Sequence, residues 1–231
     1  MTFPPWIITL ADYLEQGTNL LALAPLAVAG LQWPRLTQPL RLLACGLAIT
    51  AALVAFATLG HLTPATESLL WHVYTIVQTI FFGGIYALAF QEPRQRQLVQ
   101  LALLGFLAFA LLDWGWLEKG TSMHAYTHSV QSGLLVGLSG LYLRQLAQQM
   151  PVLHLENHSL FLASSGIVMY FSGTILLYVF AGHFISASDS MGEHAVSLLM
   201  SVVNLVQLGL FTLAFYHASQ PSSLPSARSH E

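Results

Sequence analysis

Long apolar stretches alternate with short polar breaks along the whole chain. A helix that crosses a membrane needs about 20 mostly apolar residues, and seven stretches meet this length. They cover residues 6–31, 40–59, 68–90, 98–116, 123–143, 159–184 and 192–216. Within them apolar residues run on without the alternation of polar and apolar positions that is typical of barrel strands. The pattern therefore predicts an all-α fold, a polytopic membrane protein with seven transmembrane helices.

The breaks between the stretches carry charged and turn-forming residues, and none is long enough for a separate domain. We therefore expect one seven-helix membrane domain over residues 1–218. Residues 219–231 are rich in Ser and Pro and predict a disordered cytoplasmic tail. No basic residue precedes the first apolar run, so the positive segment of a cleaved signal peptide is missing and we expect the first helix to be retained.

Composition excludes several classes of protein. Hydrophobic residues make up 55% of the chain and charged residues only 7%, whereas soluble domains carry about 25% charged residues. Seven Lys and Arg residues with a net charge of −3 exclude a nucleic-acid partner. The single cysteine, Cys45, excludes an internal disulfide framework and a multi-cysteine metal site. The lipid bilayer is the partner that this composition indicates.

The basic residues predict the orientation in the membrane. Lys and Arg gather in cytoplasmic loops of membrane proteins. Only Lys119 falls in a loop on the opposite side from the other six basic residues, which are Arg35, Arg41, Arg94, Arg96, Arg144 and Arg228. This bias predicts an outside N-terminus and an inside C-terminus, in a multi-pass protein of the bacterial cytoplasmic (inner) membrane.

Polar residues form stripes at the outer ends of several predicted helices. Ionisable groups inside a membrane are costly and indicate function by default, and residues three, four and seven apart share a helix face. Turning the stripes toward each other predicts a polar cavity open to the outside. Its candidate ligand-binding residues are Glu15, Asn19, His72, Asp113, Gln131, His194, Ser197 and Asn204. Its candidate metal ligands are His72, His124, His128, His194, Glu15 and Asp113.

Histidine chemistry is the reason for the metal hypothesis. Imidazole is the commonest metal ligand and titrates near neutral pH, and two histidines four residues apart, as at His124 and His128, can bind one metal. Structural roles stay open for the same residues. A buried histidine can simply be hydrogen-bonded, and Glu15 or Asp113 can join two helices as a polar clamp. Groups near mid-membrane could relay a change between helices, namely Gln78, Gln131, Tyr170, Ser172 and Asn204.

Small residues predict where helices approach closely. Gly133, Gly137 and Gly140 form one stripe on the predicted fifth helix, and Gly83-Gly84 and Gly166 lie on the third and sixth. Because small side chains let helix backbones meet, each of these positions predicts a close helix contact.

Several short blocks resemble a group of small, largely uncharacterised bacterial seven-helix integral membrane proteins, some of which are input modules of sensor kinases. The blocks are residues 70–77 (LWHVYTIV) and 165–173 (SGIVMYFSG), together with Glu15, His194 and Asn204. Gln78 departs from the glutamate expected after the first block. The resemblance implies seven helices and a sensory role, and it supplies no ligand.

The leading hypothesis is a receptor-like or sensory membrane module that binds a small ligand, a proton or a metal and signals through a cytoplasmic partner. One alternative is a zinc-type membrane hydrolase that acts on a lipid, with Glu15 or Asp113 as the base. Another is a haem or quinone redox protein in which His72 faces His128 or His194. The chain has no catalytic motif, so enzyme activity, a divalent metal cofactor and homo-oligomers stay open. Retinal bound as a Schiff base is excluded because the one lysine, Lys119, lies in a predicted outer loop.

Overall fold

The computed structural model describes residues 17–18, 21–60, 62–114, 125–149, 158–185 and 190–218, of which 125, 149, 177–185 and 190–196 are described by their backbone alone. The regular secondary structure in these ranges is helical and includes no strand, which confirms the all-α prediction. The helices are α2 (Leu23–Leu31), η1 (Trp33–Arg35), α3 (Gln38–Leu59), α4 (Pro64–Ala89), α5 (Pro93–Leu112), α6 (Ala125–Gln149), α7 (Ser159–Ile185) and α8 (Ser190–His217). The predicted tail and half of the first predicted helix, residues 6–16 and 19–20, lie outside the described residues.

Within the described residues, five helices are long and apolar enough to cross a membrane: α3, α4, α5, α7 and α8. They make the chain a multi-pass membrane protein. The remaining two helices differ from the five for separate reasons. Helix α2 is described over 9 residues only. Helix α6 has 25 residues, so its length suffices and its polar composition sets it apart.

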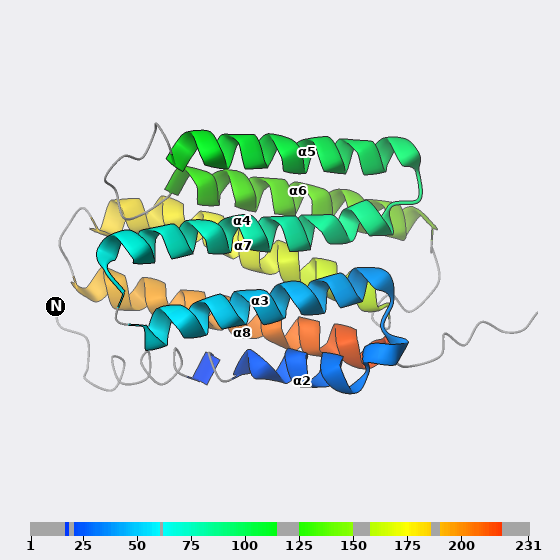
Figure 1. Ribbon diagram of the computed structural model, residues 1–231, viewed down its shortest axis with the longest axis horizontal. Coiled ribbons are helices and arrows are strands. Elements are labelled where there is room, and N and C mark those ends of the chain that lie inside the picture. The colour runs from blue at the N-terminus through cyan, green and yellow to red at the C-terminus, as the bar shows by residue number, and fades with distance from the viewer. Residues whose placement is uncertain are drawn as a thin grey trace, which may run out of the picture.

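The helices lie side by side along the long axis of the molecule (Figure 1). Helices α5 and α6 form one edge, α2 and α8 lie toward the other, and α3, α4 and α7 lie between them. Helix α4 packs against α3, α5 and α6, while α7 packs against α6 and α8. The core between them is aromatic at its centre, where Phe82 meets Phe171 and Phe211 edge to face.

Proline and capping residues set helix starts that hydropathy alone misses. Helix α5 begins at Pro93, before the apolar run at residue 98, because proline fits the first turn of a helix and the polar residues 94–97 continue it. Thr63 precedes α4, and its hydroxyl accepts a hydrogen bond from the Thr66 backbone N–H at 3.4 Å.

Close helix contacts occur at some of the predicted glycines and at Gly46, which was not predicted. A Cβ on Gly46 of α3 would lie 2.6 Å from Phe81 Cβ of α4, so only glycine fits. Gly83, Gly84 and Gly166 also meet side chains of neighbouring helices, which confirms the prediction for these positions.

The glycine stripe of α6 behaves differently. Gly133, Gly137 and Gly140 are exposed and have open space where a Cβ would be. The prediction of a close contact at this stripe within the chain is therefore wrong. Its physical reason is the helical period, which directs Leu135 and Tyr142 into the core and turns the glycines to the opposite face.

His158 lies directly before α7, outside the apolar segment, and makes stability depend on pH. Its Nδ1 is buried without a hydrogen-bond partner among the described residues, and burial lowers the pKa of His158 below 6.5. The unfolded chain therefore binds more protons than the folded one once the pH falls below about 6.5.

We expect the wild type to lose stability relative to His158→Gln as the pH falls from about 7 to 5. Thermal unfolding of both proteins in the same detergent at several pH values measures the difference. Parallel pH profiles for the two proteins would contradict this expectation.

Candidate functional site

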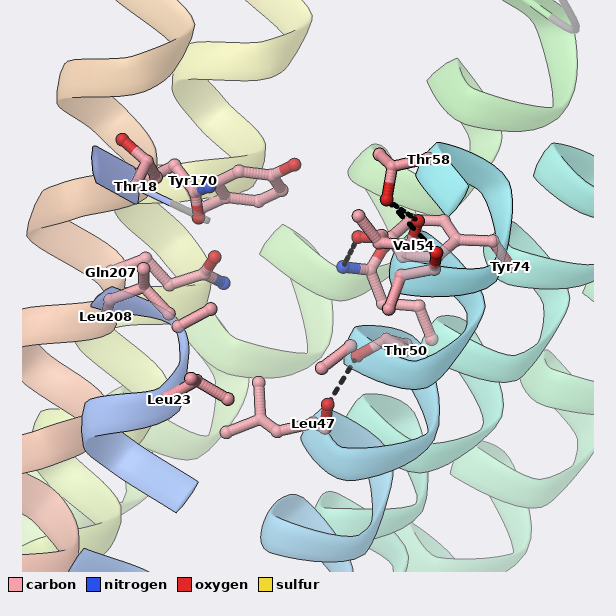
Figure 2. A pocket seen from close by; sticks show the side chains of 15 residues that line it. Thr18, Leu23, Leu47, Thr50, Val54, Thr58, Tyr74, Tyr170, Gln207 and Leu208 are labelled. Carbon is pink, nitrogen blue, oxygen red and sulfur yellow. Dashed lines mark hydrogen bonds between the residues drawn. The ribbon is translucent and has the colours of Figure 1, made fainter. Parts of the chain in front are cut away.

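A cavity of about 330 Å³ lies at mid-length of the bundle, between α2, α3, α4, α7 and α8 (Figure 2). We call it the central cavity. Its apolar lining residues are Ala22, Leu23, Leu47, Ala51, Val54, Ala55 and Leu208. Its polar lining residues all carry hydroxyl or amide groups: Thr18, Thr50, Thr58, Tyr74, Gln78, Tyr170, Asn204 and Gln207. Among the described residues, this lining has no charged side chain, so the described part of the cavity suits a neutral molecule with a few polar atoms.

Gln207 presents an open hydrogen-bond donor to this cavity. Its side chain is 4% exposed and extends from α8 into the cavity (Figure 2). The Nε2 atom has no hydrogen-bond partner among the described residues. A buried donor without a partner costs about 1–3 kcal/mol, so an acceptor oxygen from water or from a ligand would stabilise this site.

Tyr74 and Gln78 on the opposite wall connect the cavity to α6. Gln78 Nε2 donates to the Tyr74 hydroxyl at 3.2 Å. Gln78 Oε1 accepts a hydrogen bond from Gln131 Nε2 of α6 at 3.0 Å. The same Gln131 nitrogen reaches the backbone carbonyl of Thr75 at 3.3 Å. The two glutamines therefore form a buried polar link between α4 and α6.

The link continues to His128, and its geometry places a hydrogen on one ring nitrogen, Nδ1. Because Gln131 Nε2 faces two acceptors, its Oε1 faces His128 Nδ1, at 3.3 Å. An amide oxygen only accepts hydrogen bonds, so His128 Nδ1 carries a hydrogen. His128 Nε2 lies 3.3 Å from the Thr75 hydroxyl, which also lies 2.9 Å from the Trp71 carbonyl.

The Thr75 hydroxyl has one hydrogen and two partners. When the hydroxyl donates to His128 Nε2, that nitrogen is an acceptor and the imidazole is neutral. When the hydroxyl donates to the Trp71 carbonyl instead, its oxygen can accept a hydrogen bond from a protonated Nε2. The same positions of the heavy atoms therefore fit both charge states of His128. We call the chain of groups from Tyr74 through Gln78, Gln131 and His128 to Thr75 the α4/α6 relay.

A second polar cluster lies at the same end of the bundle as His128. Asp113 and Thr127 are fully buried, and the Thr127 hydroxyl donates to Asp113 Oδ2. His72 is also buried, and its ring stacks on Trp114 with 6.0 Å between ring centroids. Asp113 thus joins the end of α5 to α6, as expected for a helix-to-helix clamp.

The structure brings together part of the predicted set. Gln131 contacts His128, Asn204 lines the central cavity, and Ser197 is half-buried on α8. Glu15, Asn19 and His124 lie outside the described residues, as does the side chain of His194. Over the ranges that are described, no three His, Cys, Asp or Glu side chains lie close enough together to hold a metal ion.

The described lining of the central cavity includes one of the candidate ligand-binding residues, Asn204, and no described histidine or carboxylate. The cavity lies at mid-length of the helices. Sequence reasoning missed Gln207, although the spacing contained a signal. Gln207 follows Asn204 by three residues and so continues the polar stripe of α8 by one further turn.

We compared the chain with protein-family models, with curated proteins and with solved structures. None of the three comparisons found a match to this chain.

Proposed function

We propose that this protein is a receptor-like membrane module that binds a small neutral ligand in the central cavity. The observation that carries the proposal is the buried Gln207 Nε2, a donor directed into a cavity and lacking a partner among the described residues. A carbonyl, ether or hydroxyl oxygen would accept this hydrogen bond. Leu23, Leu47 and Val54 would contact an apolar body of the same ligand. The ligand class is therefore a neutral amphiphile with an acceptor oxygen.

Binding in the cavity would change the hydrogen bonds of the α4/α6 relay. Tyr74 and Gln78 belong to both, so a ligand oxygen that accepts from Gln78 Nε2 in place of the Tyr74 hydroxyl would move the Gln78 amide and disturb its bond to Gln131. A ligand can shift such an equilibrium by its differential affinity for the two arrangements. His128 would report this change at the end of the bundle, and a cytoplasmic partner would read the accompanying shift of α4 against α6.

The topology completes the proposal. Seven transmembrane helices with an outside N-terminus and an inside C-terminus place Arg35, Arg41, Arg94, Arg96 and Arg144 on the cytoplasmic side of a bacterial inner membrane. His72, Asp113 and His128 then lie toward the outside. The sensory character agrees with the resemblance of residues 70–77 and 165–173 to seven-helix input modules.

The test uses the full chain in lipid nanodiscs and neutral carbonyl probes such as a short-chain quinone and a monoacylglycerol. A probe that binds is expected to raise the midpoint of thermal unfolding. Gln207→Leu removes the donor and should weaken binding about tenfold. The imidazole ¹⁵N shifts of His128 should move on binding in the wild type.

Val206→Leu is the matched control, because Val206 is exposed on the same helix and should leave probe binding unchanged. Equal stabilisation of the wild type and Gln207→Leu would place the probe elsewhere and count against the proposal. A protein stabilised by charged probes and by no neutral one would contradict the ligand class.

A further inference from the structure

A second hollow lies at the other end of the bundle from His128, between the start of α5 and the end of α6. We call it the α5/α6 crevice; its volume is about 650 Å³. Val99, Ala102 and Leu138 form its apolar wall, and Leu98 and Leu141 border it. These last two side chains are 65% and 57% exposed. The crevice is therefore continuous with exposed apolar surface of α5 and α6.

The mouth of the crevice is polar and contains one positively charged and one negatively charged side chain. Arg144 and Glu92 lie there with Gln95 and Gln145. The Oε1 atoms of both glutamines are buried without a hydrogen-bond partner among the described residues. Glu92 precedes the first turn of α5, and its side chain makes no capping bond to that turn. The mouth thus offers one cation, one carboxylate and two amide oxygens that lack a donor.

We propose that the α5/α6 crevice binds a phospholipid whose headgroup combines a phosphate with a primary ammonium. Arg144 would pair with the phosphate. The ammonium would donate to the amide oxygens of Gln95 and Gln145 and pair with Glu92. An acyl chain would lie along Val99, Ala102 and Leu138. This site is separate from the central cavity and does not depend on the proposed receptor function.

Other headgroups fit these groups less well. A choline headgroup carries no N–H and cannot satisfy the two amide oxygens. An anionic glycerol headgroup supplies hydroxyl donors and brings no cation to Glu92. The crevice should therefore distinguish an ammonium from its trimethylated form at equal charge.

The test is native mass spectrometry of the full, delipidated chain with ethanolamine, choline and glycerol phospholipids that share the same acyl chains. We expect occupancy by the ethanolamine lipid to exceed that by the choline lipid about fivefold, which is a difference of about 1 kcal/mol. Arg144→Gln should lower occupancy by every phospholipid, whereas Glu92→Gln should reduce chiefly the preference for ethanolamine.

Arg94→Gln is the matched control, since Arg94 is exposed at the same end of the bundle and does not line the crevice. Retained occupancy in this control would support the assignment to Arg144. Three results would overturn the proposal: equal occupancy by the ethanolamine and choline lipids, a preference for the glycerol lipid, or an equal loss in Arg94→Gln and Arg144→Gln.

Discussion

Replacing Gln131 by leucine is expected to lower the free energy of unfolding by about 2–3 kcal/mol. The side chain is 1% exposed and contacts three polar groups, namely Gln78 Oε1, the Thr75 carbonyl and His128 Nδ1. Leucine fills a similar volume but leaves each of these groups without its present partner. Thermal unfolding in detergent, followed by the helical circular dichroism signal, should show a midpoint lower by roughly 5–10 °C.

Two variants separate the loss of hydrogen bonds from the change of shape. Val130→Leu alters the neighbouring exposed position on α6 and should leave the midpoint nearly unchanged. Gln131→Leu alone leaves the Gln78 oxygen buried without its partner, and the double variant Gln78→Leu with Gln131→Leu removes that oxygen. The combined loss of stability should therefore be smaller than the sum of the two single losses. Strictly additive losses would show that the two amides do not interact as described.

Replacing Gly46 by leucine is expected to be more damaging and to abolish the close packing of α3 on α4. Even a Cβ at this position would lie 2.6 Å from Phe81 Cβ of the neighbouring helix α4. Overpacking of a core typically costs about 1–3 kcal/mol, and the larger leucine should exceed this range. We expect the protein to elute as aggregate, or to unfold well below the wild type.

Gly137→Leu is the matched control for the same change of residue type. Gly137 is exposed on α6 with open space at the position of a Cβ, and leucine favours a helix over glycine by about 0.8–1 kcal/mol. This variant should be as stable as the wild type or more stable. A folded Gly46→Leu protein with an unchanged midpoint would show that α3 and α4 are not in close contact at this position.

The apolar pattern predicted the helical architecture well, because the cost of placing polar backbone and side chains in lipid acts on every residue of a span. It was weaker where a helix begins with polar residues, as α5 does at Pro93. Helix α6 shows a further limit. Its polar groups His128 and Gln131 face α4. A hydropathy window averages over all faces of a helix, so it cannot tell which face contacts protein and which contacts lipid.

The candidate site was predicted in part. Helical spacing alone accounts for the contacts of Tyr74 with Gln78 and of His128 with Gln131, because residues three or four apart share a face. Which helices face each other does not follow from spacing, so the contact between Gln78 and Gln131 required the structure. Gln207 was missed because its amide is neutral, whereas the predicted site was built mainly on ionisable residues. Its Nε2 is the donor of the central cavity that has no partner among the described residues.

The polarity of α6 has a consequence for biogenesis. Along α4, three groups meet α6: Thr75 faces His128, Gln78 faces Gln131, and Tyr86 bonds Ser139 at 2.6 Å. A nascent α6 that entered the lipid alone would expose His128, Gln131 and Ser139 to hydrocarbon. Because α4 precedes it in the chain, its partner is already in the membrane when α6 is synthesised. In the proposed seven-helix topology, insertion of α6 should therefore depend on α4, so that a defect in α4 would leave α6 outside the bilayer and reverse the orientation of the helices that follow.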